Sequence, residues 1–162
     1  LLLKRNNMKC YIDQSGKVEN TSKLTVVAYA NGKVRSLKIS AVEKRKLLAI
    51  MKKVDRLDTT YIYKIFAALV FLLIKGQRIS DIVIDKEYPG HEGDIKNVLK
   101  NLFERTGALF PDINFFEITK TNPAHKAAIG VYRGEKKPDL VVKTEDILNL
   151  FFAKKKGRRS HS

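Results

Sequence analysis

Cysteine is almost absent from this chain, and its scarcity excludes two kinds of site. Cys10 is the single cysteine among 162 residues, so the chain can form neither an internal disulfide nor a zinc site built from cysteines. Nothing in the cysteine content indicates an oxidising compartment, and we therefore expect a cytoplasmic protein. A nucleotide-binding glycine motif is also lacking, which argues against an activity driven by ATP.

The chain also lacks an apolar run long enough to cross a membrane. The longest run, residues 66–74, is about half of the roughly 20 residues that a spanning helix needs. We interpret it as part of a buried helix and expect no membrane partner. The first seven residues contain too few apolar side chains for a signal peptide, and Met8 resembles a natural start. Residues 1–7 are thus interpreted as an upstream extension or an expression remnant.

Acidic residues are scarce relative to basic ones. Thirty-two Lys and Arg stand against seventeen Asp and Glu, which leaves a formal net charge of +15. This imbalance raises the energy of the compact state by self-repulsion, and binding a polyanion relieves it. In lysine-rich thermophile proteins glutamate rises alongside lysine, which is not the case here. The charge favours nucleic acid as the partner over an anionic membrane surface, an acidic protein or solubility alone.

Length and composition indicate one globular domain. A chain of 162 residues, of which 44% are hydrophobic and 30% charged, has the size and composition of a single domain that folds without disulfides. We expect this domain over residues 8–153. A disordered basic tail is expected over residues 154–162, where three lysines and two arginines would attract phosphates without specificity.

Local patterns predict a run of strands followed by alternating helices and strands. Strands are expected over residues 9–13, 24–30, 34–40, 81–88 and 114–119. Helices are expected over residues 41–53, 61–75, 94–105, 123–133 and 146–153. This order predicts an α/β protein with helices on both faces of a mixed five-stranded sheet. The sheet would combine an antiparallel meander of three strands with two parallel strands.

Carboxylates occur at two places where strands are expected to end. Asp13 closes the first strand, and Asp85 and Glu87 lie at the end of a buried apolar strand. Asp85 and Glu87 point to the same side if that strand continues, and two close carboxylates repel unless a cation lies between them. We favour a metal site over a surface salt bridge for this pair. For Asp13 a turn-forming role before Ser15 stays open.

The element order and three short motifs resemble the ribonuclease H-like superfamily. Tyr11-Ile12-Asp13-Gln14-Ser15-Gly16 is similar to the first-strand motif of that family, and Asp85-Lys86-Glu87-Tyr88 to its fourth-strand motif. Asn122-Pro123-Ala124-His125-Lys126-Ala127-Ala128 resembles the last-helix motif, with His125 in place of the final aspartate. The resemblance covers nearly all of residues 9–135.

The resemblance implies a divalent-metal-dependent nuclease that hydrolyses phosphodiester bonds in an RNA–DNA hybrid or a structured nucleic acid. Two Mg²⁺ or Mn²⁺ ions would be held by Asp13 and Asp85, with Glu87 or Glu43 as a further ligand. His125, or alternatively His91, would assist proton transfer, so that the expected catalytic set is Asp13, Asp85, Glu87 and His125. A histidine at position 125 can bind Mn²⁺, or it can mark a lost second metal site.

Two other functions stay open. The chain could be a non-catalytic nucleic-acid-binding module of the same fold, or an adaptor for an acidic protein. For binding nucleic acid, the phosphate contacts are expected from basic residues that are otherwise solvated surface: Lys44, Arg45, Lys46, Arg133, Lys136 and Lys137.

Two acidic segments also allow more than one interpretation. Residues 87–94, which include His91, Glu92 and Asp94, form either a functional loop or a Pro-Gly turn whose acids complement a helix dipole. Asp139 is either a late acid of the site or part of a turn. The oligomeric state cannot be read from the sequence.

Overall fold

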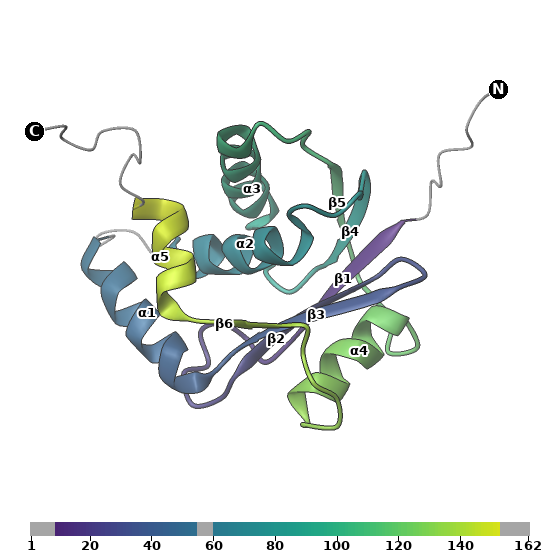
Figure 1. Ribbon diagram of the computed structural model, residues 1–162, viewed down its shortest axis with the longest axis horizontal. Coiled ribbons are helices and arrows are strands. Elements are labelled where there is room, and N and C mark those ends of the chain that lie inside the picture. The colour runs from purple at the N-terminus through teal and green to yellow at the C-terminus, as the bar shows by residue number, and fades with distance from the viewer. Residues whose placement is uncertain (1–8, 55–59, 153–162) are drawn as a thin grey trace, which may run out of the picture.

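The fold is described by a computed structural model that covers residues 9–54 and 60–152 (Figure 1). The expected extension at 1–7 and the expected tail at 154–162 lie outside the described residues. Within them, no helix has the length and apolar character needed to cross a membrane. The elements in chain order are β1 (Cys10–Ser15), β2 (Thr25–Ala30), β3 (Val34–Ile39), α1 (Ala41–Val54), α2 (Tyr61–Ile74), β4 (Asp81–Asp85), α3 (Glu92–Thr106), β5 (Asp112–Phe116), α4 (Pro123–Tyr132), β6 (Leu140–Val142) and α5 (Thr144–Phe152).

The strands form one mixed sheet in the order β5-β4-β1-β2-β3-β6. β2 is antiparallel to β1 and β3, whereas β4 is parallel to β1 and to β5. The α/β class, the meander and the two parallel strands are thus confirmed. The predicted total of five strands is wrong, because β6 adds a sixth that runs parallel to β3. β6 has only three residues, too few for an alternating pattern to be visible in the sequence.

Asp139 holds the chain at the start of β6. Its backbone N–H donates to the Ser36 carbonyl (2.9 Å), and its Oδ2 accepts a hydrogen bond from the Ser36 N–H (2.8 Å). The carboxylate therefore links the connection between α4 and β6 to β3. These contacts favour the turn interpretation of Asp139 over a role at a functional site.

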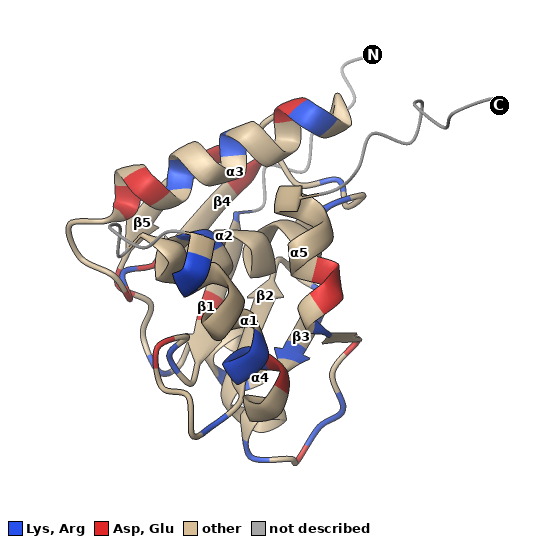
Figure 2. Ribbon diagram, turned by 90° about the vertical axis from the view of Figure 1, so that its left-hand side faces the viewer, with Lys and Arg blue, Asp and Glu red and all other residues tan. Residues whose placement is uncertain are grey.

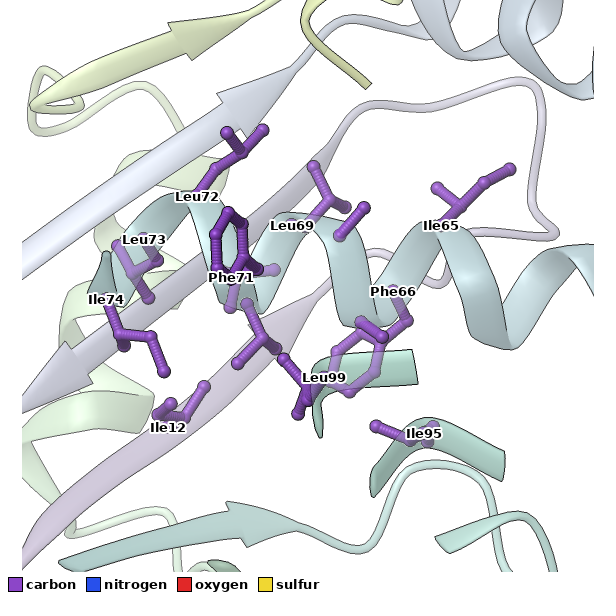
Figure 3. Packing of buried hydrophobic residues seen from close by; sticks show 14 of the residues in the cluster. Ile12, Ile65, Phe66, Leu69, Phe71, Leu72, Leu73, Ile74, Ile95 and Leu99 are labelled. Atoms are coloured by element: carbon purple, nitrogen blue, oxygen red, sulfur yellow. The ribbon is translucent and has the colours of Figure 1, made fainter. Parts of the chain in front are cut away.

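Helix α2 forms the centre of the larger core. Every residue from 65 to 74 is buried, so the predicted buried helix is confirmed. Figure 3 shows the side chain of Ile74 near Ile12 of β1 and that of Phe66 near Leu99 of α3. Full burial of each such side chain stabilises the fold by about 1.5–3 kcal/mol. Figure 1 places α1, α2, α3 and α5 on this face of the sheet.

Of the helices in the described residues, α4 alone lies on the opposite face, which we call the α4 face (Figure 1). Ala127 and Ala128 pack against Val26 and Ala28 of β2, and such small side chains allow the helix to approach the sheet closely. The helix begins as its sequence predicts, with the Asn122 side chain accepting a hydrogen bond from the Ala124 N–H (2.9 Å) and proline at the first position. Because α4 packs on the sheet in this way, His125 lies next to Asp13 of β1.

A lysine begins the buried stripe of α1. Lys44 is fully buried on the same side of α1 as Leu47, Leu48 and Met51, whereas Val42 is 52% exposed. Lys44 Nζ donates hydrogen bonds to the Lys17 carbonyl (3.1 Å) and to Thr25 Oγ1 (3.0 Å). This burial argues against contact of Lys44 with phosphate, because its ammonium group is enclosed by the protein.

Burial of Lys44 should make the stability of the protein depend on pH. Loss of hydration lowers the Lys44 pKa from 10.5 to about 8 in the folded state. Between these values the unfolded chain binds the proton and the folded chain does not, so stability rises with pH across this window. From pH 7 to 9.5 we expect the wild type to gain on the order of 1–2 kcal/mol relative to Lys44→Met.

Urea unfolding of both proteins at the two pH values measures this gain. Lys52→Met is the matched control, since Lys52 lies on the same helix but is exposed. An equal pH dependence in Lys44→Met and the wild type would contradict the lowered pKa.

Candidate metal centre

Asp13 is buried inside β1. The strand continues to Ser15, which pairs with Val26, so the expectation that it ends at Asp13 is wrong. The residue is 3% exposed, and its Oδ1 accepts a hydrogen bond from the Gln14 N–H (2.8 Å). Burial is the main cause that raises the Asp13 pKa, with the charge of Asp85 adding to the increase and hydrogen bonds from Gln14 and His125 opposing it. Asp13 is thus a carboxylate within the sheet rather than a turn residue.

Asp85 and Glu87 come together through a turn rather than along a strand. β4 ends at Asp85, and the Glu87 N–H donates to the Asp85 carbonyl (2.8 Å). The expected strand over residues 81–88 is therefore too long, and strand alternation is not what orients Glu87. Asp85 Oδ1 accepts a hydrogen bond from the Ile118 N–H (2.7 Å), which ties it to the segment after β5. Burial first, and then the hydrogen bond and charge of Asp85, raise the Glu87 pKa to about 7.

Asp13, Asp85 and Glu87 form what we call the acidic cluster. Each offers a carboxylate oxygen, and the three oxygens lie within 4.8 Å of one another. Each carboxylate oxygen has two acceptor sites, so an oxygen that already accepts an N–H can still bind a cation. An all-oxygen donor set suits Mg²⁺, Mn²⁺ or Ca²⁺, and such an ion would remove the repulsion among the acids. The acidic cluster can therefore hold a metal ion.

His125 approaches the acidic cluster from α4. Its Nδ1 lies 2.8 Å from Asp13 Oδ2, and its side chain is 29% exposed. When Nδ1–H donates to Asp13, Nε2 carries the lone pair and can accept a proton or bind a metal. The structure thus brings together all four residues of the expected catalytic set. Their role in catalysis stays a prediction.

Glu43 lies elsewhere. Its Oε1 accepts hydrogen bonds from the Thr144 N–H (3.0 Å) and Oγ1 (3.2 Å), and its Oε2 accepts from Lys46 Nζ (3.2 Å). The Thr144 N–H is the main cause that holds the Glu43 pKa below its usual value. These contacts connect α1 to the start of α5, and Glu43 does not belong to the acidic cluster. The structure therefore favours Glu87 over Glu43 as the further metal ligand.

His91 likewise contacts residues outside the acidic cluster. Its ring stacks on Tyr63 at 3.9 Å between centroids, and its Nδ1 is 3.1 Å from Asp94 Oδ2. Glu92 and Asp94 occupy the first turn of α3, where acids complement the helix dipole. Residues 87–94 thus combine a helix start with one residue of the acidic cluster, and His125 is favoured over His91 for proton transfer.

The other expected phosphate contacts lie on several elements. Arg45 donates to the Thr21 carbonyl (3.0 Å), Lys46 pairs with Glu43, and Arg133, Lys136 and Lys137 are exposed in or next to the α4–β6 connection. Figure 2 shows Lys and Arg on helices, on β3 and on loops rather than gathered on one element. Contact of these residues with phosphate stays a prediction.

The sequence did not indicate the contacts that join the β1–β2 connection to Tyr88, the residue after Glu87 of the acidic cluster. Tyr88 Oη accepts hydrogen bonds from the Val18 N–H and from Gln14 Nε2, both at 3.2 Å. The charge of Lys17 acts to lower the Glu87 pKa. This connection needs Gly16, whose φ is +79° and where a Cβ would lie 2.2 Å from the Leu24 carbonyl oxygen. The glycine indicated a turn, but nothing local indicated that the turn reaches Tyr88.

The site is built from three parts of the chain that are far apart in sequence. β1 supplies Asp13, the end of β4 with its turn supplies Asp85 and Glu87, and α4 supplies His125. Comparison of the chain with models of known protein families, with curated proteins and with solved structures finds no significant match.

Proposed function

We propose that the protein is a divalent-metal-dependent nuclease of ribonuclease H-like fold. The observation that carries the proposal is the acidic cluster with His125 beside it. The β1–β3 meander followed by parallel strands β4 and β5 supports the resemblance, and β6 is an addition to that arrangement. The net charge of +15 supports a polyanionic substrate.

The residues divide into ligands and a proton acceptor. Asp13, Asp85 and Glu87 would hold Mg²⁺ or Mn²⁺, with two ions expected from the resemblance. Such ions lower the pKa of a bound water and neutralise charge on a phosphate. His125 Nε2 would accept the proton of the attacking water as its oxygen bonds to phosphorus, and the bond to the leaving 3′ oxygen breaks. Asp13 would orient the imidazole through Nδ1 and stabilise the imidazolium that forms.

A cleavage assay tests the proposal. End-labelled RNA–DNA hybrid, double-stranded RNA, a DNA junction and single strands are incubated with the protein in Mg²⁺, in Mn²⁺ and in EDTA. We expect at least one substrate to be cut with either metal and none to be cut in EDTA. Cleavage that persists in EDTA would contradict the proposal, and so would intact substrates under every condition.

A non-catalytic nucleic-acid-binding module is the second candidate. It is favoured by one observation, that a histidine bonded to Asp13 stands where the resemblance implies a fourth carboxylate. This candidate predicts binding whose affinity falls steeply with salt concentration, without cleavage in any metal. An adaptor for an acidic protein would show no affinity for nucleic acid even at low salt.

A further inference from the structure

Part of the α4 face carries side chains from three adjacent strands next to the acidic cluster. Tyr11 is paired with Val83 across β1 and β4, and Asp85 is paired with Phe116 across β4 and β5. Because side chains alternate along a strand, Tyr11 and Val83 share this face with Asp13 and Asp85. The residues between them point into the core on the other side. The metal ligands and these apolar residues therefore lie on one continuous surface.

A groove of about 280 Å³ lies on this surface, and we call it the β5 groove. It is lined by Tyr11, Val83 and Phe116 of the three strands and by Ile118, Thr119 and Asn122 of the connection to α4. Phe116 is 59% exposed, although an aromatic ring of this size normally stabilises a protein by being buried. The β5 groove thus offers an aromatic surface to a ligand.

The β5 groove adjoins the acidic cluster directly. The N–H of Ile118, which lines the groove, donates to Asp85 Oδ1 at 2.7 Å. Phe116 is the strand neighbour of Asp85. A ligand with a phosphate at the acidic cluster would therefore place its next group in the groove.

The charges of the groove favour a neutral group there. Lys9 and Glu117 also line it, one basic and one acidic, so the groove has no excess of positive charge for a phosphate. Thr119 and Asn122 carry hydroxyl and amide groups that can form hydrogen bonds with the edge of a base. Any nucleobase has a flat face that stacks on an aromatic ring.

We propose that the β5 groove binds an unpaired base of a single-stranded nucleic acid whose backbone phosphate lies at the acidic cluster. The inference rests on the proposed function and narrows its substrate to single strands or unpaired ends. A base inside a duplex is stacked on both faces and cannot enter the groove. A strand that binds here would be held by the stacked base as well as by its phosphates.

Phe116→Trp gives a direct test, because the natural chain contains no tryptophan. The variant is titrated in Ca²⁺, which suits an all-oxygen site, with a single-stranded DNA 12-mer and with a sugar-phosphate 12-mer of the same charge that lacks bases, and electrophoresis checks that the strands stay intact. We expect the single strand to quench the tryptophan fluorescence and the abasic strand to leave it unchanged. An equal response to both strands, or none to either, would overturn the proposal.

Phe116→Ala tests the contribution of the ring to affinity. Loss of one base-stacking contact should weaken binding of the single strand about 5- to 150-fold in Ca²⁺ and leave binding of a blunt duplex unchanged. Val141→Ala on β6 is the matched control, since Val141 is 58% exposed at the other end of the sheet. Sedimentation of both variants is compared with the wild type, and a dimer that dissociates only in Phe116→Ala would assign the surface to self-association and overturn the proposal.

Measuring binding and cleavage separately distinguishes this inference from the nuclease itself. If the wild type cleaves nucleic acid but Phe116→Ala binds single strands as the wild type does, the β5 groove proposal fails and the nuclease stands. If the tryptophan responds only to strands with bases but nothing is cleaved in any metal, the groove proposal stands and the nuclease fails.

Discussion

Asp13→Asn should reduce metal-dependent cleavage on the order of 10³-fold or more while leaving nucleic-acid binding intact. The substitution keeps the shape of the side chain but removes the charge of the most buried acid of the cluster, whose Oδ2 lies 2.8 Å from His125 Nδ1. A metal site that loses a buried carboxylate loses several kcal/mol of charge stabilisation, and each 1.4 kcal/mol is tenfold in rate. Initial cleavage rates under saturating metal measure the effect.

Asp139→Asn is the matched control for this experiment. The Asp139 carboxylate accepts a hydrogen bond from the Ser36 N–H and lies outside the acidic cluster. The Asp139→Asn protein should therefore cleave at a rate near the wild-type value. Circular dichroism establishes that both variants are folded. An Asp13→Asn protein that cleaves like the wild type would remove Asp13 from the mechanism.

A divalent cation should stabilise the folded protein strongly at pH 8. At a metal concentration one hundred times the dissociation constant, binding to the folded state alone adds about 2.7 kcal/mol. For a domain of this size that corresponds to a rise in Tm of about 5–11 °C. Thermal unfolding with Mn²⁺ and with EDTA measures the shift, which we expect to be much smaller in Glu87→Gln. An equal shift in Glu87→Gln would show that the ion binds elsewhere.

Without metal, Glu87 should make the protein less stable as pH rises. The folded-state pKa of about 7 lies above the usual 4.5, so between these values the folded protein keeps a proton that the unfolded chain releases. Stability is therefore lost across this window, on the order of 1–2 kcal/mol after solvent screening. Urea unfolding in EDTA at pH 5 and pH 7.5 should show this loss in the wild type and not in Glu87→Gln.

Metal affinity should also depend on the protonation of Glu87, and it should increase with pH. Below pH 7 the ion must displace the proton from Glu87, so metal affinity should rise with pH between about 6 and 8. Calorimetric titration with Mn²⁺ at several pH values measures this dependence. A metal affinity that is constant over this range would contradict the raised Glu87 pKa or the assignment of Glu87 as a ligand.

Short-range patterns in the sequence were sufficient for much of the fold. The hairpin signal at Asn31-Gly32, the apolar run of α2 and the Asn122-Pro123 helix start all act through neighbours along the chain. Among the residues that the structure describes, they predicted five of the six strands and all five helices, with ends that differ by a few residues. The same local patterns selected Asp13 and Asp85, because an acid at the expected end of an apolar strand is unusual, although β1 in fact continues past Asp13.

Long-range contacts decided what those patterns could not. β6 exists because three residues pair with β3 from the far end of the chain, and Lys44 is buried because Lys17 and Thr25 accept its hydrogen bonds. The helical period places Lys44 on the same face of α1 as Leu47, Leu48 and Met51. The charge of Lys44 predicted an exposed side chain, and only the packing of α1 on the sheet reversed that expectation.

The sequence by itself identified the residues of the candidate site in this protein, and the tertiary structure decided how they are arranged. The motifs identified Asp13, Asp85, Glu87 and His125, but strand alternation gave the wrong reason for Glu87, which reaches Asp85 through a turn. Sequence patterns likewise could not separate Glu87 from Glu43, since the choice depends on Thr144, about one hundred residues further along the chain. Residue types and local periods are properties of short segments, whereas burial and the distance between carboxylates exist only after the whole chain has folded.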